Sequence, residues 1–311
     1  MEDFVRSEKL KEVQQVGCRL LDEFARICKE HNLRWFVDSG TLLGAIRHGG
    51  FIPWDDDIDV IMPREDYNRL NQLGNSVTKE PFYLQTTKDA LCSVELLLKD
   101  SSTTKIKETD CYELLGSPDK KFLGNKGIAM DIAMLDHVPS DIKRRESIVQ
   151  FLSALHQYYL QNVVTFSYSN GIKFNYDNFQ AMAAQMESEL TKSDLENKNS
   201  GYMGCTTWWI NPKYFGCSVS SSCYDDYIEM DFAGCEEKVR VPVGYDEILT
   251  AYYGNWHVEQ QGLSLHENTN YILDTAKSFK DYEAKGFINL MAELKNAETD
   301  KIIQVSGGII G

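Results

Sequence analysis

Apolar residues in the first part of the chain recur first with helical spacing and then with strand spacing. Across residues 7–31 they return every three or four positions, which predicts an amphipathic helix. The run 34–37 predicts a short strand. After a turn, residues 42–47 predict one or two helical turns, which Gly49 and Gly50 stop.

Residues 57–62 alternate with the period of two that is typical of a β-strand. Asp57 and Asp59 would share one face of this strand, with apolar residues on the other. Pro63 ends the strand and opens a helix that Gly74 terminates. Further strands are predicted over residues 82–86, 94–100 and 127–135, and Asp131 lies in the middle of the last one.

From residue 141 onward the pattern becomes mainly helical, with long helices predicted over 141–166 and 177–196. Residues 227–232 and 237–243 predict a β-hairpin, and 245–254 predict a helix. The fold class is therefore α/β (α+β), a mixed sheet with flanking helices. We expect a core over residues 1–140 and a mainly helical region over 141–311 that packs on it, because no long linker separates them.

Composition and charge exclude several classes of protein. The formal net charge of -15 argues against a partner that is a nucleic acid or an anionic membrane. The first residues are charged and no window approaches 18 uncharged apolar residues, so neither a signal peptide nor a membrane span is expected. The eight cysteines include no C-x2-C pair among the clustered four, which favours reduced thiols over a zinc site. We expect a cytoplasmic globular protein.

Four carboxylates gather just before and within the strand predicted over 57–62: Asp55, Asp56, Asp57 and Asp59. Two unit charges about 4 Å apart repel by roughly 4 kcal/mol at an effective dielectric constant of about 20. Such a cluster needs water or a cation to neutralise it. Carboxylates at positions i and i+2 of a strand point the same way and can reach one or two hard cations such as Mg²⁺ or Mn²⁺.

Small residues lie upstream of this cluster. Ser39, Gly40 and Thr41 form a turn followed by a helix start, where backbone N–H groups can receive a phosphate. A D-x-D strand about 17 residues after such a turn is the layout of a nucleotidyltransferase-like active site. Asp131 is the natural third carboxylate, because a carboxylate inside an apolar strand is costly without a partner.

The same residues also admit structural roles. A D-x-D pair occurs often on solvated loops, and Asp56 can be part of a solvated turn or a helix cap instead of the site. Arg47 and Lys99 can hold phosphate or extend along the rim of the site. His266 can bind substrate or be structural. Asp136, five residues beyond Asp131, should lie too far along the strand to share a metal.

The segment 35–67, WFVDSGTLLGAIRHGGFIPWDDDIDVIMPREDY, closely resembles the signature block of the LicD family of phosphotransferases, which includes fukutin-like enzymes. Residues 127–139, residues 241–256 and His266 extend the resemblance, which spans roughly residues 8–270. It implies a nucleotidyltransferase-like fold and metal-dependent transfer of a substituted phosphate from a CDP-linked donor to a glycan hydroxyl. In bacterial members the group is typically phosphocholine, and CMP is released.

The resemblance also assigns roles. Asp57 and Asp59 match the metal-binding pair, Asp131 the third carboxylate, and Gly40 with Thr41 the phosphate-holding turn. The chain departs from the family pattern at Ser39, where glycine is common. It also departs at residues 133–134, where an alanine and a methionine replace the usual aromatic residue and proline.

Three hypotheses follow. The first is phosphocholine transfer from CDP-choline to a glycan or a lipid-linked glycan precursor, with the region 141–311 on the acceptor side. The second keeps the fold and moves a polyol phosphate or aminoethyl-type phosphate from another CDP-linked donor. The third is a non-catalytic member that binds nucleotide or glycan. Aromatic residues that could face the choline ammonium are Trp54, Trp208, Trp209 and Tyr253.

Overall fold

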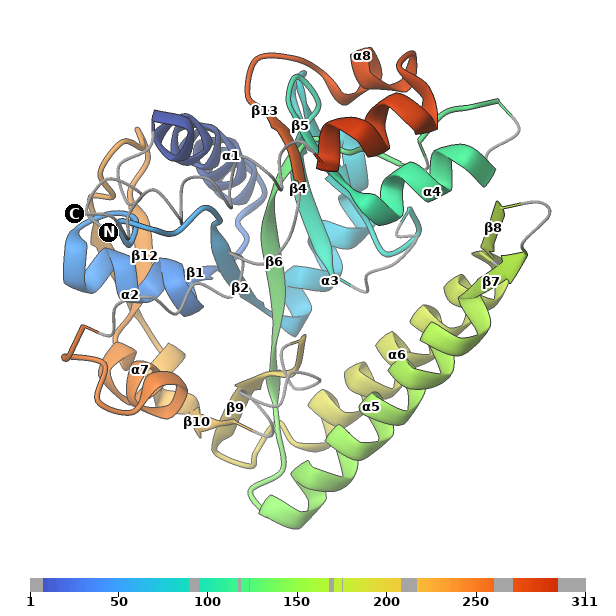
Figure 1. Cartoon of the computed structure of the whole chain (residues 1–311). Coiled ribbons are helices and arrows are strands. Elements are labelled where there is room, and N and C mark those ends of the chain that lie inside the picture. The colour runs from blue at the N-terminus through green and yellow to red at the C-terminus, as the bar shows by residue number, and fades with distance from the viewer. Residues whose placement is uncertain are drawn as a thin grey trace, which may run out of the picture.

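The computed structural model describes residues 8–89, 95–116, 119–122, 124–167, 171–174, 176–207, 217–259 and 271–295. A seven-stranded sheet runs through the centre, with helices packed around it (Figure 1). Its strand order is β1-β2-β6-β4-β3, with β9 added to β6 and β10 added to β9. These strands are β1 (Phe36–Val37), β2 (Asp59–Pro63), β3 (Phe82–Gln85), β4 (Leu96–Asp100), β6 (Ile128–His137), β9 (Tyr202–Cys205) and β10 (Val219–Ser220).

The sheet is mixed, as the sequence predicts. Strands β2 and β6 run parallel, whereas the other pairs are antiparallel. All five residues of β2 are buried, so the predicted alternation between a polar and an apolar face does not appear in its burial. The reason is its position: β2 lies between β1 and β6, and helices cover the sheet around it.

Three helices of the first part of the chain position this strand: α1 (Glu8–His31), α2 (Ser39–His48) and α3 (Arg64–Leu73). The helix α1 has the predicted extent and packs against β6 and β4. The helix α2 begins at Ser39, earlier than predicted, so Ser39, Gly40 and Thr41 form its first turn. It ends at Gly49, whose φ of 67° is the left-handed conformation that glycine adopts without strain.

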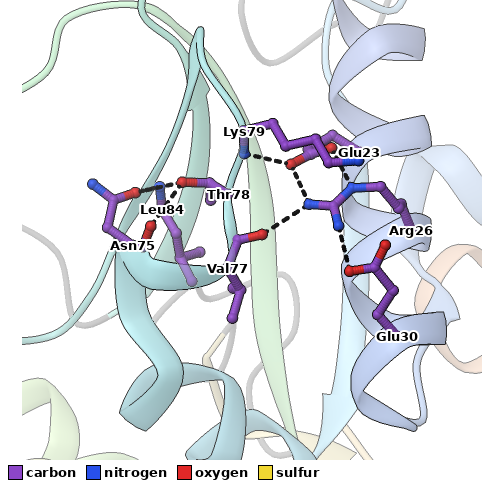
Figure 2. Close-up of polar contacts among 8 residues, drawn as sticks. All are labelled: Glu23, Arg26, Glu30, Asn75, Val77, Thr78, Lys79 and Leu84. Carbon is purple, nitrogen blue, oxygen red and sulfur yellow. Dashed lines mark hydrogen bonds and ion pairs between the residues drawn. The ribbon is translucent and has the colours of Figure 1, made fainter.

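A cluster of charged side chains fixes α1 to the segment before β3 (Figure 2). The Arg26 guanidinium donates to both carboxylate oxygens of Glu23, at 2.8 and 2.7 Å, and to the Val77 carbonyl at 2.8 Å. The backbone N–H of Lys79 donates to Glu23 Oε1 at 2.9 Å. Because Val77 ends the short 3₁₀ helix η1 (Gly74–Val77), these bonds hold α1 over the edge of the sheet that β3 forms.

The second part of the chain contains a long antiparallel pair of helices, α5 (Ile142–Val163) and α6 (Tyr176–Glu196), which extends away from the sheet (Figure 1). Its tip is a hairpin of β7 (Val164–Ser167) and β8 (Gly171–Phe174), where the sequence predicted helix through residue 166. The tip contacts α4 (Glu108–Gly116). The division at residue 140 stays a prediction, although β9 and β10 show that the second part contributes strands to the sheet.

The predicted hairpin and the helix after it are confirmed as β11 (Tyr227–Met230), β12 (Val239–Pro242) and α7 (Tyr245–Tyr253). The hairpin loop, residues 231–238, lies against the first part of the chain, because the Ala233 N–H donates to the Gly49 carbonyl at 2.8 Å. The helix α7 packs on α2.

Two strands that the sequence did not reveal form a separate antiparallel pair, β5 (Thr104–Lys107) and β13 (Tyr271–Asp274). The helix α8 (Phe279–Glu283) and a helical segment over residues 286–295 follow β13 and share a second hydrophobic core with α4. Among the helices described, none is long and apolar enough to cross a membrane.

Candidate active site

Parallel pairing of β2 with β6 places Asp59 directly opposite Asp131 in the sheet. Asp57, just before β2, adds a third carboxylate, and one oxygen from each of the three residues lies within 4.8 Å of the other two. Ligands on opposite sides of a cation at about 2.1–2.5 Å lie roughly 4.2–5.0 Å apart, so one hard cation fits this spacing. The structure therefore assembles the three aspartates that the sequence singled out.

A second trio shares Asp57 with the first: Asp55, Asp56 and Asp57 also bring carboxylate oxygens within 4.8 Å of one another. Asp57 is thus common to two groups of acidic ligands. Two neighbouring groups that share one carboxylate are suited to a pair of cations, which can hold the attacking and leaving oxygens of a phosphoryl displacement.

The negative charge of this cluster affects the pKa of Asp59, the residue at its centre. Burial raises the pKa of Asp59 well above its ordinary value, and repulsion from Asp57, Asp131 and Asp55 raises it further. Asp57 and Asp131 are only half-buried. The charged form of Asp59 is therefore disfavoured without a cation, and a bound cation would offset this cost.

The first turn of α2 is bonded to the start of β2. The Asp59 N–H donates to Thr41 Oγ1 at 2.8 Å, and the Asp38 N–H donates to the Asp59 carbonyl at 3.1 Å. A Cβ atom on Gly40 would lie only 2.7 Å from Asp55 Oδ2. The Asp55 carboxylate can therefore lie this close to the helix backbone only because residue 40 is a glycine. The predicted phosphate-holding residues thus lie beside the acidic cluster, but as the N-terminus of a helix.

Ser39 has a φ of 47°, in the left-handed region that is unfavourable for residues with a Cβ. Glycine is common at this position in the family that the sequence resembles. The structure explains why glycine would suit this position: the backbone of Ser39 has the left-handed conformation that glycine adopts most easily.

Asp38 is a buried carboxylate that sequence reasoning did not single out, because it was interpreted as part of a turn. It is 1% exposed. Burial and then the charge of Asp38 raise the pKa of the buried phenols of Tyr224 and Tyr252. Asp38 also contributes to the raised pKa of Asp59. Its position directly before the turn of residues 39–41 could have indicated that Asp38 lies near the site.

Two predicted substrate-binding residues, Arg47 and Lys99, have hydrogen-bond partners of their own, and a third lies outside the described residues. Arg47 lies at the opposite end of α2, about 12 Å along the helix from Ser39, and donates to the Trp256 carbonyl at 3.3 Å. Lys99 lies on β4 opposite Ala129, and its Nζ donates to the Asn125 carbonyl at 2.7 Å. His266 lies outside the described residues.

The aromatic candidates divide in the same way. Trp54 and Tyr253 are half-buried and pack against the main hydrophobic core. Trp208 and Trp209 lie outside the described residues. The cysteines of the described part of the chain are free thiols, and the acidic groups that could hold a metal there contain no cysteine.

Asp136 has a separate, buried partner. Arg64, the first residue of α3, donates to Asp136 from Nε at 2.6 Å and from Nη2 at 2.5 Å, and the Thr206 hydroxyl donates to the same carboxylate. An odd separation of five residues along β6 points Asp136 to the opposite face of the sheet from Asp131. This confirms that Asp136 does not join the carboxylate cluster.

Asp56, in contrast, pairs with the positively charged side chain of Lys105. Its Oδ2 lies 3.6 Å from Nζ of Lys105, on β5. Sequence reasoning missed Lys105, because nothing local to its segment predicted that β5 would lie beside the acidic residues.

Comparisons with known proteins place this arrangement in a family. Residues 32–114 match the family described as LicD/FKTN/FKRP, nucleotidyltransferase domain. The chain is 29% identical over 262 residues to the lipopolysaccharide cholinephosphotransferase LicD of Haemophilus influenzae, an alignment that covers 79% of this chain and 91% of that protein.

Shorter similarities fall on smaller parts of the chain. Human ribitol 5-phosphate transferase FKRP is 41% identical over 59 residues, which cover 18% of this chain and 12% of that protein. An uncharacterized protein of Rickettsia prowazekii is 40% identical over 72 residues, covering 21% of this chain and 27% of that protein. Together with the convergent aspartates, these similarities identify the chain as a member of the LicD/FKTN/FKRP family.

Proposed function

We propose that this protein transfers phosphocholine from CDP-choline to a hydroxyl group of a cell-surface glycan or its lipid-linked precursor, with release of CMP. The observation that carries the proposal is the convergence of Asp57, Asp59 and Asp131 beside the N-terminus of α2. The similarity to LicD of Haemophilus influenzae over most of both chains supports the choice of phosphocholine as the group transferred.

Different residues of the site would bind the metal, bind the phosphate and accept the proton. Asp57, Asp59 and Asp131 would hold Mg²⁺ or Mn²⁺, which supplies positive charge at a transferring phosphate when bound. The backbone N–H groups at the start of α2 favour a phosphate through the helix dipole. Asp131 is half-buried whereas Asp59 is buried, so Asp131 is better placed to accept the proton of the attacking hydroxyl.

The choline head group would need an aromatic face, because a quaternary ammonium is attracted to the π-system of a ring by about 0.5–2 kcal/mol. Trp54 and Tyr253 are the two candidates within the described residues that are half-exposed enough to offer a ring. Truncating each to leucine should weaken binding of CDP-choline more than binding of CMP if that ring holds the head group.

A second candidate function is transfer of a polyol phosphate from a CDP-linked donor. It is favoured by the 41% identity to ribitol 5-phosphate transferase FKRP over 59 residues. A non-catalytic binder is disfavoured, because such a protein gains nothing from three convergent carboxylates.

The test is CMP release by the purified protein with Mg²⁺ and a panel of CDP-linked donors, with the shift in melting temperature as a measure of binding when the acceptor is absent. We expect CDP-choline to stabilise the protein more than CDP-glycerol, CDP-ribitol or UDP-sugars. An equal or larger shift with a polyol donor would favour the second candidate. No stabilisation by any cytidine nucleotide would refute both.

A further inference from the structure

Lys105 links the small β5–β13 sheet to the acidic cluster. Its Nζ lies 3.6 Å from Asp56 Oδ2 and 5.0 Å from the centre of the Tyr271 ring on β13. Its side chain is 20% exposed. The Lys105 backbone N–H donates to the Lys126 carbonyl at 2.7 Å, which fixes the strand at this residue.

The surroundings keep Lys105 charged. Burial by itself would lower the pKa of its ammonium group, yet the pKa is raised, because Asp56 and Tyr271 lie beside it and Asp57 and Asp131 lie within electrostatic range. Lys105 therefore carries its charge beside Asp56, a member of the second trio of carboxylates.

We propose that Lys105 binds the phosphate groups of the donor, an inference that rests on the proposed function. When metal cations bind the aspartates, the ion pair between Lys105 and Asp56 would break. The Lys105 ammonium group could then bind a phosphate of the donor. A lysine suits this role, because its ammonium is a compact point charge with three donors. The alternative is that Lys105 only neutralises Asp56 and Asp57.

Lys107 provides a matched control. It lies two residues further on the same strand, so it shares a face with Lys105, and its Nζ is 5.9 Å from the centre of the same Tyr271 ring. Unlike Lys105 it is exposed. Lys105→Met and Lys107→Met therefore remove the same charge from the same strand at different distances from the aspartates.

The experiment measures three affinities by calorimetry for the full chain and both variants: Mg²⁺ alone, and CDP-choline and inorganic pyrophosphate in the presence of Mg²⁺. We expect Lys105→Met to weaken binding of both phosphate ligands about tenfold or more, with Lys105→Arg intermediate. Lys107→Met should change either affinity less than about twofold, because an exposed charge is screened. Melting temperatures show whether each variant is folded.

The outcomes separate this inference from the proposed function. Tighter Mg²⁺ binding with unchanged phosphate affinity in Lys105→Met would make Lys105 a counter-ion and overturn the inference. A lowered melting temperature with unchanged affinities would give it a structural role and also overturn it. Binding of pyrophosphate that depends on Lys105, without binding of any CDP-linked donor, would refute the donor assignment and leave the inference standing.

A different observation concerns two cysteines. Sγ of Cys18, on α1, and Sγ of Cys235, in the loop of residues 231–238, are 2.6 Å apart, and both are free thiols. The loop is held in place one helical turn after Cys18, where Asp22 Oδ1 accepts the N–H groups of Glu236 and Glu237 at 3.0 and 2.9 Å. The two sulfur atoms are thus held together by contacts of the backbone.

We infer that Cys18 and Cys235 form a disulfide when a small-molecule disulfide such as oxidised glutathione is present. A thiolate formed within this pair would attack the oxidant and release one glutathione thiolate. The other cysteine would then attack the mixed disulfide and release the second. Two protons leave the protein and two electrons pass to glutathione, and the new bond ties α1 to the β11–β12 hairpin.

The test is intact mass with differential alkylation after native incubation in oxidised glutathione. We expect the protein to lose the mass of two hydrogen atoms and to yield a crosslinked peptide that contains Cys18 and Cys235, reversibly with reductant. Cys18→Ser should instead retain a glutathione adduct on Cys235. A persistent adduct on Cys235 in the unsubstituted protein, or full alkylation of both thiols after oxidation, would overturn the inference.

Discussion

Replacing Asp136 by asparagine tests whether this residue stabilises the fold, in contrast to Asp131 on the same strand, which we expect to act in the reaction. The Asp136 and Arg64 side chains are only 2% and 3% exposed, and two hydrogen bonds of 2.6 and 2.5 Å join them. Asparagine keeps the shape of the side chain and loses its charge. The substitution therefore leaves the guanidinium of Arg64 buried without its counter-charge.

The magnitude follows from that burial. Breaking a buried ion pair by removing one partner costs about 3–5 kcal/mol, a large share of the roughly 5–15 kcal/mol that stabilises a typical domain. At about 2 °C per kcal/mol, we expect Asp136→Asn to lower the melting temperature by roughly 6–10 °C. The turnover of the fraction that remains folded should fall only modestly, because Asp136 lies outside the carboxylate cluster.

Asp131→Asn is the matched comparison, since it is the same substitution five residues earlier in β6. Asp131 is half-buried among like charges, so its neutralisation should leave the melting temperature unchanged or raise it. As a metal ligand and acceptor of a proton, it should be needed for turnover. We expect a loss of at least about a hundredfold in kcat for a protein that stays folded.

The assay is CMP release together with a melting curve and a chemical denaturation curve for both variants. The reasoning is refuted if Asp131→Asn melts at a lower temperature while its turnover is near normal. It is also refuted if Asp136→Asn, corrected for the folded fraction, loses more activity than Asp131→Asn.

Other predictions concern the same site. Excess chelator or Asp57→Asn should abolish CMP release without unfolding the protein, and full activity in chelator would exclude a metal-dependent reaction. Thr41→Val removes the acceptor for the Asp59 N–H and should cost about 1–3 kcal/mol in denaturation, with no change if that bond is unimportant. Ser39→Gly should raise stability by up to about 1 kcal/mol, because its φ of 47° suits glycine, and a loss would contradict this backbone argument. Because the pKa of Asp59 is raised by burial and then by Asp57, the metal-free protein should become less stable as pH rises from the unfolded pKa to the folded one. Denaturation at several pH values, with Asp59→Asn lacking this dependence, checks that sign.

The sequence by itself determined the elements whose pattern is local. The amphipathic spacing of α1, the hairpin of β11 and β12, and the helix α7 before Gly254 were all predicted and found. A helix or a strand shows its period within a few residues, so neighbouring side chains suffice to recognise it. The acidic cluster was predictable for a related reason: an aspartate inside an apolar strand requires a partner, and the D-x-D strand was the evident one.

What lay beyond local pattern was which segments meet. The pairing of β5 with β13 joins residues 104–107 to 271–274, and it is this contact that surrounds Lys105 with Tyr271 as well as Asp56. The position of Asp136 along the strand predicted that it lies outside the cluster, but only the tertiary structure showed that Arg64 is its buried partner. A sequence states which groups carry charge, but the energy of a charge depends on its burial and on its distance from other charges. Those two quantities are set by contacts between distant segments, so only the tertiary structure showed that Arg64 pairs with Asp136 and that Lys105 lies beside Asp56.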